Sequence, residues 1–267
     1  EGVTIEVNYN RNSYILTWVN TKPESVITNE TAYTKIGSIK YGTTIVAPEY
    51  SLEGHTYIWS ATVPSTMPAG DLTLTTQWDA VAVNYSVVHK FETVDGGTFV
   101  EDATMSETLS TKFGTTSDAK AKNVDGFVPN TIDQKIIDAN DIVVEVLYRR
   151  VSYNLTWVNN SKPEATITNE DAYTKAGSVK YGTAIVAPQY SLEGYTYTWS
   201  VDVPSNMPAA DFSSSVVFKA IDYTITYNGA ENGSISGKTT ANYGEKVIVT
   251  IAPDENYEIA TITPSES

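Results

Sequence analysis

Apolar and polar side chains alternate along several short stretches of this chain. Between Tyr153 and Val158, large apolar residues alternate with Asn154 and Thr156, and a period of two residues is typical of a half-buried strand. We therefore expect a strand whose inward face carries Tyr153, Leu155 and Trp157. A second strand is expected to carry Tyr195, Tyr197 and Trp199 on one face, and a third to run through Phe212, Ser214, Val216 and Phe218, which match Leu72, Leu74, Thr76 and Trp78.

The chain contains a long internal repeat. The segment that begins at Ser13 returns at Ser152, with roughly three in four positions identical and one residue inserted after Asn159. Residues 6–11, before the first copy, resemble residues 145–150, before the second. The repeating unit is therefore a pair of domains about 139 residues long.

This period predicts three complete domains and two partial ones. Residues 1–12 are expected to be the last strand of a preceding domain. Residues 223–267 are expected to be a partial domain that further residues complete or a neighbour supports, because such short pieces seldom form a core alone. The complete domains are predicted at residues 13–83, 84–150 and 151–222. The chain is thus expected to begin and end within an array, and short linkers predict an elongated one.

Two segments are less regular. Residues 22–35 follow neither the strand period nor the helix period, which leaves a short helix and an irregular crossover as alternatives. Residues 84–150 begin and end with apolar stretches, at 85–91 and 142–148, and contain a turn at Asp95-Gly96-Gly97. First and last strands that bracket a domain often pair centrally, but the pattern does not determine the topology of this segment.

Composition supports an all-β chain and removes several kinds of function. Tyr is abundant at 18 residues and Gly and Pro recur, which favours strands and turns. Cys is absent, which excludes disulfides, thiolate metal sites and cysteine nucleophiles. A net charge of -15 with 17 Lys and Arg argues against a nucleic-acid partner. No apolar run approaches the roughly 20 residues that cross a bilayer, and the first residues are unlike a signal peptide.

Residues 13–83 and 152–222 resemble the internalin B-type repeat of Listeria and Bacteroides proteins, for which the resemblance implies a β-grasp fold. The family's Gly before Trp is Ile58 or Thr198 here. The closest elements are Tyr41-Gly42, Gly54 to Trp59, and Met67-Pro68-Ala69 with Asp71, together with their counterparts in the second copy.

The remaining segments resemble other bacterial repeats. Residues 84–150 are similar to mucin-binding-protein (MucBP) repeats through Tyr85-Ser86-Val87, the turn at Asp95, Gly126-Phe127 and the strand ending at Tyr148. Residues 223–267 resemble the start of divergent tandem repeats, through the strand at Tyr223 and the turn at Gly233. Together the resemblances imply tandem small β-grasp-like domains of an extracellular, cell-surface or secreted bacterial protein.

The tryptophans invite a carbohydrate-binding interpretation, because exposed planar rings stack on sugars. Trp18 and Trp157 share a strand face with Tyr and Leu, however, and Trp59 and Trp199 stand where the internalin-type pattern has a core Trp. We expect core packing for all four.

No constellation of residues indicates catalysis or metal binding. His55 and His89 are the only histidines, and Tyr195 replaces His55 in the second copy, so that position is a general aromatic slot. The acidic pairs Asp138 with Asp141 and Asp95 with Asp125 lack the spacing of an EF-hand and are expected to be solvated. No carboxylate pair stands out and no nucleophile elbow occurs. A Lys-to-Asn isopeptide bond is not expected, and neither is a cofactor.

Two hypotheses about function remain. The first is a monomeric, non-catalytic stalk or spacer, part of an adhesin. The alternative is a module that binds host or dietary glycans, mucin or surface proteins, through residues 84–150 or through an aromatic strip formed by Tyr33, Tyr50, Tyr173 and Tyr190.

Overall fold

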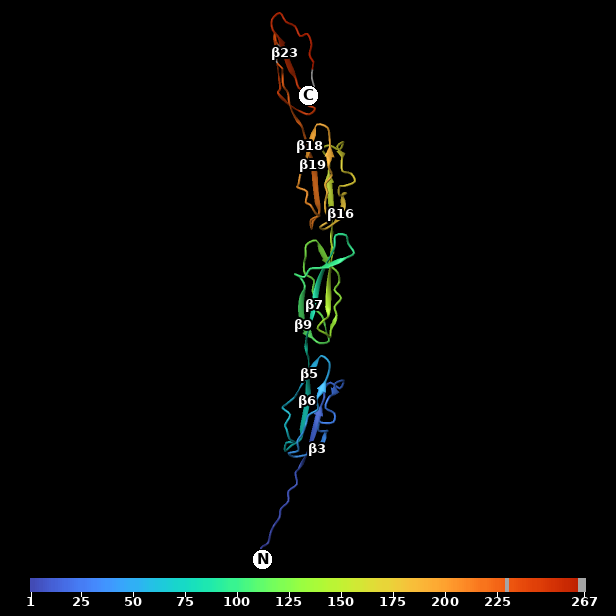
Figure 1. The fold of residues 1–267 in the computed structure, drawn as a ribbon, viewed down its shortest axis with the longest axis vertical. Helices are drawn as coiled ribbons and strands as arrows, with labels where there is room; N and C mark the ends of the chain where they lie inside the picture. The colour runs from blue at the N-terminus through green and yellow to red at the C-terminus, as the bar shows by residue number, and fades with distance from the viewer. Residues whose placement is uncertain (229–230, 264–267) are drawn as a thin grey trace. The chain divides into compact units, whose positions relative to one another are not determined.

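The chain is all-β. The computed structural model describes residues 1–228 and 231–263, and among these residues only strands, turns and loops occur. Within these ranges there is no helix of the length and hydropathy needed to cross a membrane. The strands and their labels can be followed along the colour gradient in Figure 1.

Two compact units are formed. The first comprises Glu1–Glu92, Phe99–Lys122 and Pro129–Tyr148, and the second comprises Thr93–Thr98, Asn123–Val128 and Arg149–Ser267. These limits differ from the domain boundaries expected from the sequence, which remain a prediction.

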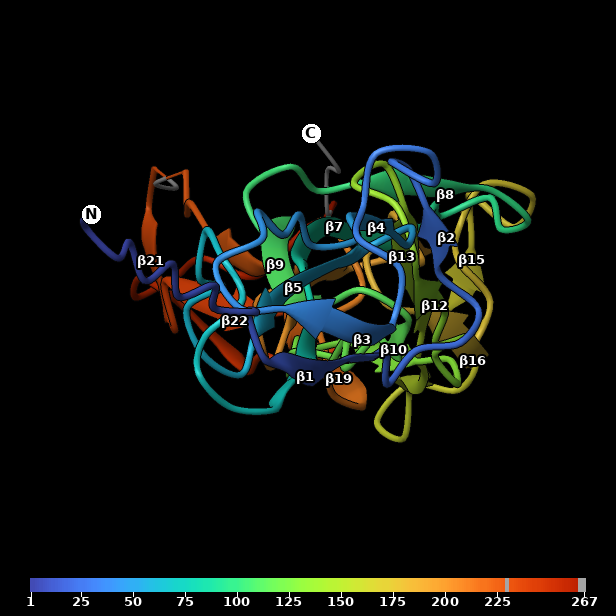
Figure 2. The ribbon, with the colours of Figure 1, turned by 90° about the horizontal axis from the view of Figure 1, so that it is seen from below.

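The first four-stranded sheet has the strand order β3-β1-β6-β5. Its central strands β1 and β6 are parallel, with Leu16 opposite Leu72, and both outer strands are antiparallel to their neighbours. Figure 2 shows β3 beside β1. This order, with the first and last strands side by side at the centre, is β-grasp-like. The strands are β1 (Ser13–Val19), β3 (Gly37–Lys40), β5 (His55–Trp59) and β6 (Leu72–Ala80).

An irregular crossover joins β1 to β3, so the helix alternative for residues 22–35 is wrong. Within it, β2 (Val26–Ile27) pairs with β4 (Tyr50–Ser51). The Asn29 side chain fixes the crossover to the later loop, because its amide donates to the Ala47 carbonyl and its Oδ1 accepts from the Glu49 N–H. Such side-chain bonds let the backbone do without a helix.

The five-stranded sheet is built around β7. Its first and last strands, whose pairing the sequence left open, are parallel neighbours in a register from Val143 opposite Ser86 to Tyr148 opposite Phe91. Strands β9 and β8 pair with successive parts of the other edge of β7. The strands are β7 (Ala82–Glu92), β8 (Phe99–Glu101), β9 (Glu107–Lys112), β11 (Phe127–Pro129) and β13 (Val143–Arg150), with a separate pair β10 (Thr115–Thr116) and β12 (Ile136–Ile137).

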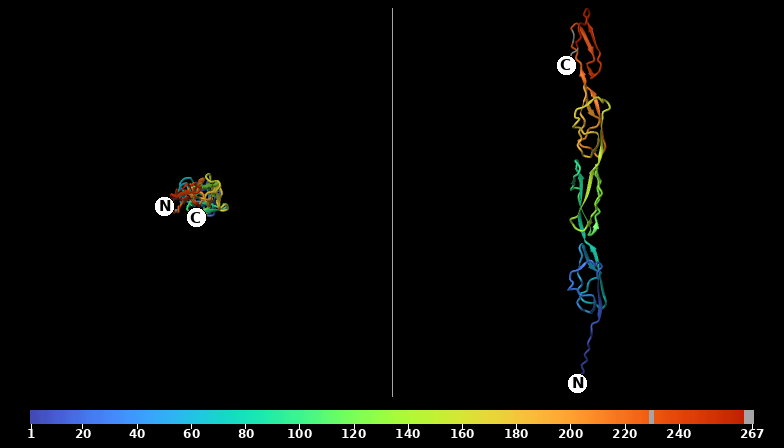
Figure 3. Two further views of the ribbon diagram at one scale, coloured as in Figure 1. Left: turned by 90° about the horizontal axis from the view of Figure 1, so that it is seen from above. Right: turned by 90° about the vertical axis from the view of Figure 1, so that its right-hand side faces the viewer.

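The second four-stranded sheet repeats the first in order and register, β16-β14-β19-β18, with β14 and β19 parallel and Leu155 opposite Phe212. It is the yellow-to-orange part of the right-hand view in Figure 3. The strands are β14 (Ser152–Val158), β16 (Gly177–Lys180), β18 (Tyr195–Trp199) and β19 (Phe212–Ala220), with the crossover pair β15 (Thr166–Ile167) and β17 (Tyr190–Ser191).

The two ends of the described chain carry apolar side chains without a core. Residues 1–12 form no strand, and Ile5 and Tyr9 are 84% and 91% exposed, although their counterparts in β13, Val144 and Tyr148, are fully buried. The C-terminal segment consists of two antiparallel pairs. The expected completion of this segment by residues beyond Ser267 lies outside the described residues. Its strands are β20 (Asp222–Thr224), β21 (Gly233–Gly237), β22 (Thr240–Asn242) and β23 (Val249–Pro253).

Each four-stranded sheet packs one face onto a small apolar core. Leu16, Met67 and Leu74 are buried in the first, and Leu155 and Met207 occupy the same positions in the second. Ile15, on the opposite face of β1, is 49% exposed. The inward face expected for β14, which carries Tyr153, Leu155 and Trp157, is therefore confirmed.

Candidate functional site

The aromatic residues of each four-stranded sheet gather in one cluster. In the first sheet, Trp18 and Trp59 pack with ring centroids 5.2 Å apart, and in the second, Trp157 and Trp199 pack at 5.1 Å. Trp18 is 9% exposed and Trp59 packs against the core. The predicted core packing is confirmed for Trp18, Trp59 and Trp157, and Trp199 packs against Trp157. We call these sets the aromatic clusters, formed by Trp18, Tyr50, Tyr57, Trp59 and Trp78 and by Trp157, Tyr190, Tyr197, Trp199 and Phe218.

The proposed aromatic strip belongs largely to these clusters. The Tyr50 ring lies 5.6 Å from Tyr57 and 6.3 Å from Trp78, and burial raises the pKa of its hydroxyl. Tyr33 packs against the same core, and the Lys35 ammonium lies 3.9 Å from the centre of its ring. In the second copy the Tyr190 ring lies 5.8 Å from Tyr197, and the Lys175 ammonium lies 3.8 Å from the centre of the Tyr173 ring. Tyr50 and Tyr190 therefore pack against aromatic rings of their own sheet, and Tyr33 and Tyr173 make cation–π contacts with neighbouring lysines.

A polar network distinguishes the first aromatic cluster from the second. The Thr76 hydroxyl is buried, and it accepts from the Trp78 indole N–H at 3.0 Å and from the Thr21 N–H at 3.0 Å. Asn20 Oδ1 is a second acceptor for the indole at 3.1 Å. In the second copy Val216 and Phe218 replace Thr76 and Trp78, so the network has no equivalent donor or hydroxyl there.

The two histidines have different surroundings. The His55 ring meets the Phe113 ring edge-on, with centroids 5.9 Å apart, and Tyr195 meets Tyr243 at 5.8 Å with similar geometry. His55 therefore occupies the aromatic slot that the two copies indicated. His89 is fully buried, and its Nδ1 lies 2.8 Å from the Tyr148 hydroxyl. Burial lowers the pKa of His89, and the Lys122 charge lowers it further.

The four aspartates considered as Ca²⁺ ligands, Asp95, Asp125, Asp138 and Asp141, are all exposed. Across residues 1–228 and 231–263, no group of three or more His, Cys, Asp or Glu side chains is arranged to hold a metal ion.

Successive sheets are connected by a single residue, in an arrangement that occurs three times. Val81 alone separates β6 from β7. Its N–H donates to the Gly54 carbonyl in the preceding sheet at 2.9 Å, and its carbonyl accepts from the Phe113 N–H in the following sheet at 2.9 Å. We call this arrangement a joint, formed by a linker residue, a turn glycine before it and an aromatic ring after it.

The glycine of the first joint is required by a close approach. Gly54 has a φ of +66°, and a β-carbon at this position would lie 2.1 Å from Cγ of Phe113. The turn is closed by the His55 N–H, which donates to the Leu52 carbonyl at 3.1 Å. The Phe113 ring therefore lies directly on the turn backbone, a position from which any side chain would displace it.

The second and third joints repeat this geometry. Val151 bonds to the Gly126 carbonyl and the Tyr181 N–H, at 2.9 and 2.8 Å. Ile221 bonds to the Gly194 carbonyl and the Tyr243 N–H, at 2.8 and 2.9 Å. In both, the ring covers the glycine. All three joints therefore combine a Gly-aromatic pair, Gly54-His55, Gly126-Phe127 or Gly194-Tyr195, with an aromatic-Gly pair, Phe113-Gly114, Tyr181-Gly182 or Tyr243-Gly244.

Charged side chains add to individual joints. In the first, Lys112 Nζ lies 2.5 Å from Asp79 Oδ1 and lowers the pKa of that carboxyl, but both groups are exposed, so the pair adds little stability. In the second, the Arg150 guanidinium lies 5.0 Å from the Phe127 ring and donates to the Tyr181 carbonyl at 2.9 Å. The Gly-aromatic chemistry is therefore common to all joints, whereas the charges are not.

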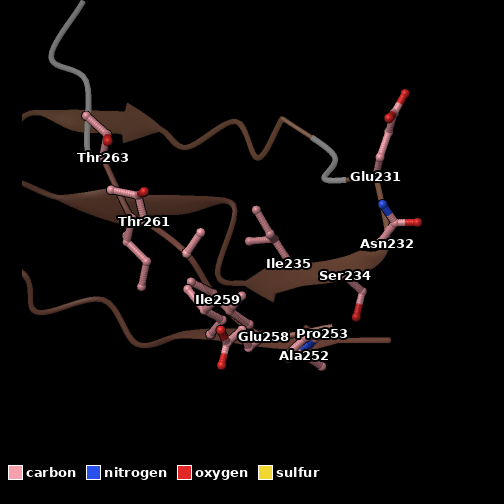
Figure 4. Close-up of a pocket in the computed structure, with 14 residues that line it drawn as sticks. Glu231, Asn232, Ser234, Ile235, Ala252, Pro253, Glu258, Ile259, Thr261 and Thr263 are labelled. Atoms are coloured by element: carbon pink, nitrogen blue, oxygen red, sulfur yellow. The ribbon is translucent and has the colours of Figure 1, made fainter. Parts of the chain in front are cut away.

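The C-terminal segment contains a cavity of about 400 Å³, shown in Figure 4. Ile235 of β21 and Ile259 of the following segment line it, and its charged lining residues are Glu231 and Glu258. The remaining lining mixes apolar residues such as Ile251 and Ile262 with polar residues such as Ser234 and Thr261. The cavity thus presents both polar and apolar surface.

No family model matches the chain, and no curated protein matches it. The solved structures with a low level of similarity include the following two. Streptococcal High Identity Repeats in Tandem (SHIRT) domains 3-4 from a cell surface protein share 15% identity at a TM-score of 0.25, over 52% of this chain and 98% of that one. The Bacillus anthracis TIE protein shares 16% identity at a TM-score of 0.35, over 78% of this chain and 51% of that one. These identities and TM-scores are too low to assign a family or a role to this chain. The resemblance to internalin-type and MucBP repeats remains a prediction.

Proposed function

We propose that this chain is a non-catalytic spacer region of a bacterial cell-surface or secreted protein, with the role of a stalk in an adhesin. The observation that carries the proposal is the joint. Flexible linkers leave their backbone groups to water, but both polar backbone groups of Val81, Val151 and Ile221 bond to the sheets on either side. Relative motion of neighbouring domains is the default when an interface is small and polar, and the joints oppose it.

The internal repeat supports the same proposal. An enzyme needs one constellation of groups in one place, whereas a spacer needs length, and duplication of whole domains supplies length directly. The joint residues Gly194 and Tyr181 of the second copy stand where the first copy has the joint residue Gly54 and the matching Tyr41. What is repeated therefore includes the parts that connect one sheet to the next.

The glycan-binding alternative is less well supported. A sugar ring needs an open aromatic face, but the rings of Tyr50 and Tyr190 pack against their own clusters, and lysines lie over Tyr33 and Tyr173. Binding of defined host or dietary glycans to the intact chain on a glycan array, reduced by Tyr50→Ala and Tyr190→Ala, would favour the alternative.

A distance measurement tests the spacer proposal. The chain has no cysteine, so Ile58→Cys in β5 and Val100→Cys in β8, both exposed in the native chain, place one spin label on each side of the first joint. A narrow distance distribution is expected. A broad distribution, as for a flexible linker, would overturn the proposal. Small-angle scattering of the whole chain should then report an elongated particle.

A further inference from the structure

In each of the three large sheets, the strand by which the chain enters and the strand by which it leaves are parallel neighbours. These pairs are β1 with β6, β7 with β13, and β14 with β19. The entering strand is the first of its sheet and the leaving strand is the last. In the first and third sheets the outer strands are antiparallel to these central pairs, and in the middle sheet β8 and β9 are antiparallel to β7.

This topology determines how a pull on the chain acts on a sheet. Because β1 and β6 run in the same direction, the start of β1 and the end of β6 lie at opposite ends of the pair. Tension applied through the chain therefore draws the two strands past each other along their axes. The slanted, evenly spaced hydrogen bonds of a parallel pair are then loaded together. In a hairpin pulled at its open end, by contrast, the bonds break one after another.

The linkers carry tension from one sheet to the next without slack. Val81, Val151 and Ile221 are single residues between a leaving strand and the next entering strand. A pull that reaches the end of β6 is therefore passed to the start of β7 through one residue.

The central pairs are also shielded from water. Leu16 and Leu74 of the first pair are buried, as are Leu155 and Val216 of the third. The pair β7 and β13 has the longest parallel register, and Val87, His89, Val144, Val146 and Tyr148 beneath it are all fully buried. A buried backbone bond that breaks cannot be replaced at once by a bond to water.

We propose that the three parallel pairs are tension-bearing clamps, so that the chain serves as a load-bearing tether as well as a spacer. This inference extends the proposed spacer function and rests on it only for the source of the load. The inference also predicts the order in which parts of the chain rupture under tension. The C-terminal pairs β20–β22 and β21–β23 are antiparallel, so this segment should rupture at the lowest force, and the five-stranded sheet at the highest.

Single-molecule force spectroscopy on the whole chain tests the clamps. Two double variants share Asn10→Cys, which lies before β1. Asp79→Cys, near the end of β6, gives a pull that shears β1 against β6. Tyr41→Cys, next to the end of β3, gives a pull that opens the antiparallel β1–β3 ladder from its Ser13–Lys40 end. The three replaced side chains, Asn10, Asp79 and Tyr41, are all exposed, and the native chain has no competing thiol.

We expect the rupture force in the shearing direction to be several-fold higher than in the opening direction, at the same loading rate. Equal forces, or a lower force in shear, would overturn the clamps. Because the same folded sheet is pulled in both variants, a difference in stability cannot imitate the result, and a matched urea midpoint confirms that both variants fold.

Pulling the unmodified chain by its ends gives a second readout. Each large sheet should lengthen the chain by roughly 200 Å on rupture, since an extended residue spans at most about 3.6 Å. The C-terminal segment should rupture first, in shorter steps at lower force, and the three long steps should come afterwards at higher force. Long steps at forces no higher than those of the C-terminal segment would also overturn the clamps. A narrow distance distribution between the labels, together with equal rupture forces in the two directions, would support the spacer and overturn the clamps. A broad distance distribution, together with a higher rupture force in shear, would support the clamps and overturn the rigid spacer.

Discussion

The ring of Phe113 lies against the backbone of Gly54, so close that a β-carbon on residue 54 would sit 2.1 Å from the ring carbon Cγ. These residues belong to successive sheets, and Val81 bonds to the backbone of both. The contact ties two sheets together at a point where the sequence shows only a turn in one and an aromatic residue in the other.

Gly54→Ala should loosen the first joint. The new methyl group displaces the Phe113 ring, and a non-Gly residue with φ near +66° adds strain on the order of 1 kcal/mol. The distance distribution between labels at residues 58 and 100 should broaden. Gly97→Ala is the matched control, because Gly97 has a φ of +77° but no atom within 4 Å of an added β-carbon. Broadening in both variants, or in neither, would contradict the role assigned to the ring contact.

Trp18→Ala should destabilise the first four-stranded sheet by about 3–5 kcal/mol, because it leaves a cavity beside Trp59 in the core. Ile15→Ala, on the exposed face of the same strand, should cost less than about 1 kcal/mol. Urea unfolding followed by far-ultraviolet circular dichroism measures both. An unchanged midpoint for Trp18→Ala would reopen the carbohydrate-stacking interpretation.

Thr76→Val should destabilise the same sheet by about 1–3 kcal/mol, although valine is the native residue at the matching position of the second copy, Val216. The substitution removes the hydroxyl that accepts from the Trp78 indole and from the Thr21 N–H. Thr73→Val, on the exposed face of β6, is the control and should change the urea midpoint little. A neutral Thr76→Val would show that the network adds no stability.

Stability of the five-stranded sheet should fall as the pH drops below the ordinary histidine pKa of about 6.5. Burial and the Lys122 charge lower the pKa of His89 in the folded state, although Glu107 and Asp102 act in the opposite direction. Between the ordinary and the lowered pKa the unfolded chain binds the proton and the folded chain does not, so acid favours unfolding.

His89→Gln provides the control for this pH effect, because glutamine stays neutral. The urea midpoint of the native chain should decrease more between pH 7.5 and 5.5 than that of the variant, since other groups titrate equally in both. Parallel pH profiles would contradict a lowered pKa for His89.

The strands could be predicted from the sequence because their inward residues repeat every second position. Leu16 and Leu155 are buried as the pattern requires, and the Trp pairs pack where two such faces meet. The form of the crossover at residues 22–35 does not follow from the sequence pattern, because its order comes from single side chains such as Asn29, whose partners Ala47 and Glu49 lie far along the chain. Period alone does not detect such bonds.

The joints could not be predicted for a related reason. Tyr41-Gly42 and Tyr181-Gly182 are recognisable as turn residues, and the alignment of His55 with Tyr195 indicates an aromatic slot. The partner of each turn glycine, however, lies in the next sheet, as Phe113 does for Gly54. One signal could have revealed it, namely that every Gly-aromatic pair before a linker has an aromatic-Gly pair after it.

The single-residue linkers also bear on how such a chain can change length over generations. Both halves of every joint use the same glycine and aromatic chemistry, and they lie on opposite sides of one linker residue. A duplication of whole sheets therefore brings compatible halves together at each new boundary, and no new interface has to arise by mutation. An insertion of even one residue in a linker would instead reverse which side of the next strand faces inward. Growth by whole sheets, as in the copies that begin at Ser13 and Ser152, keeps every boundary intact.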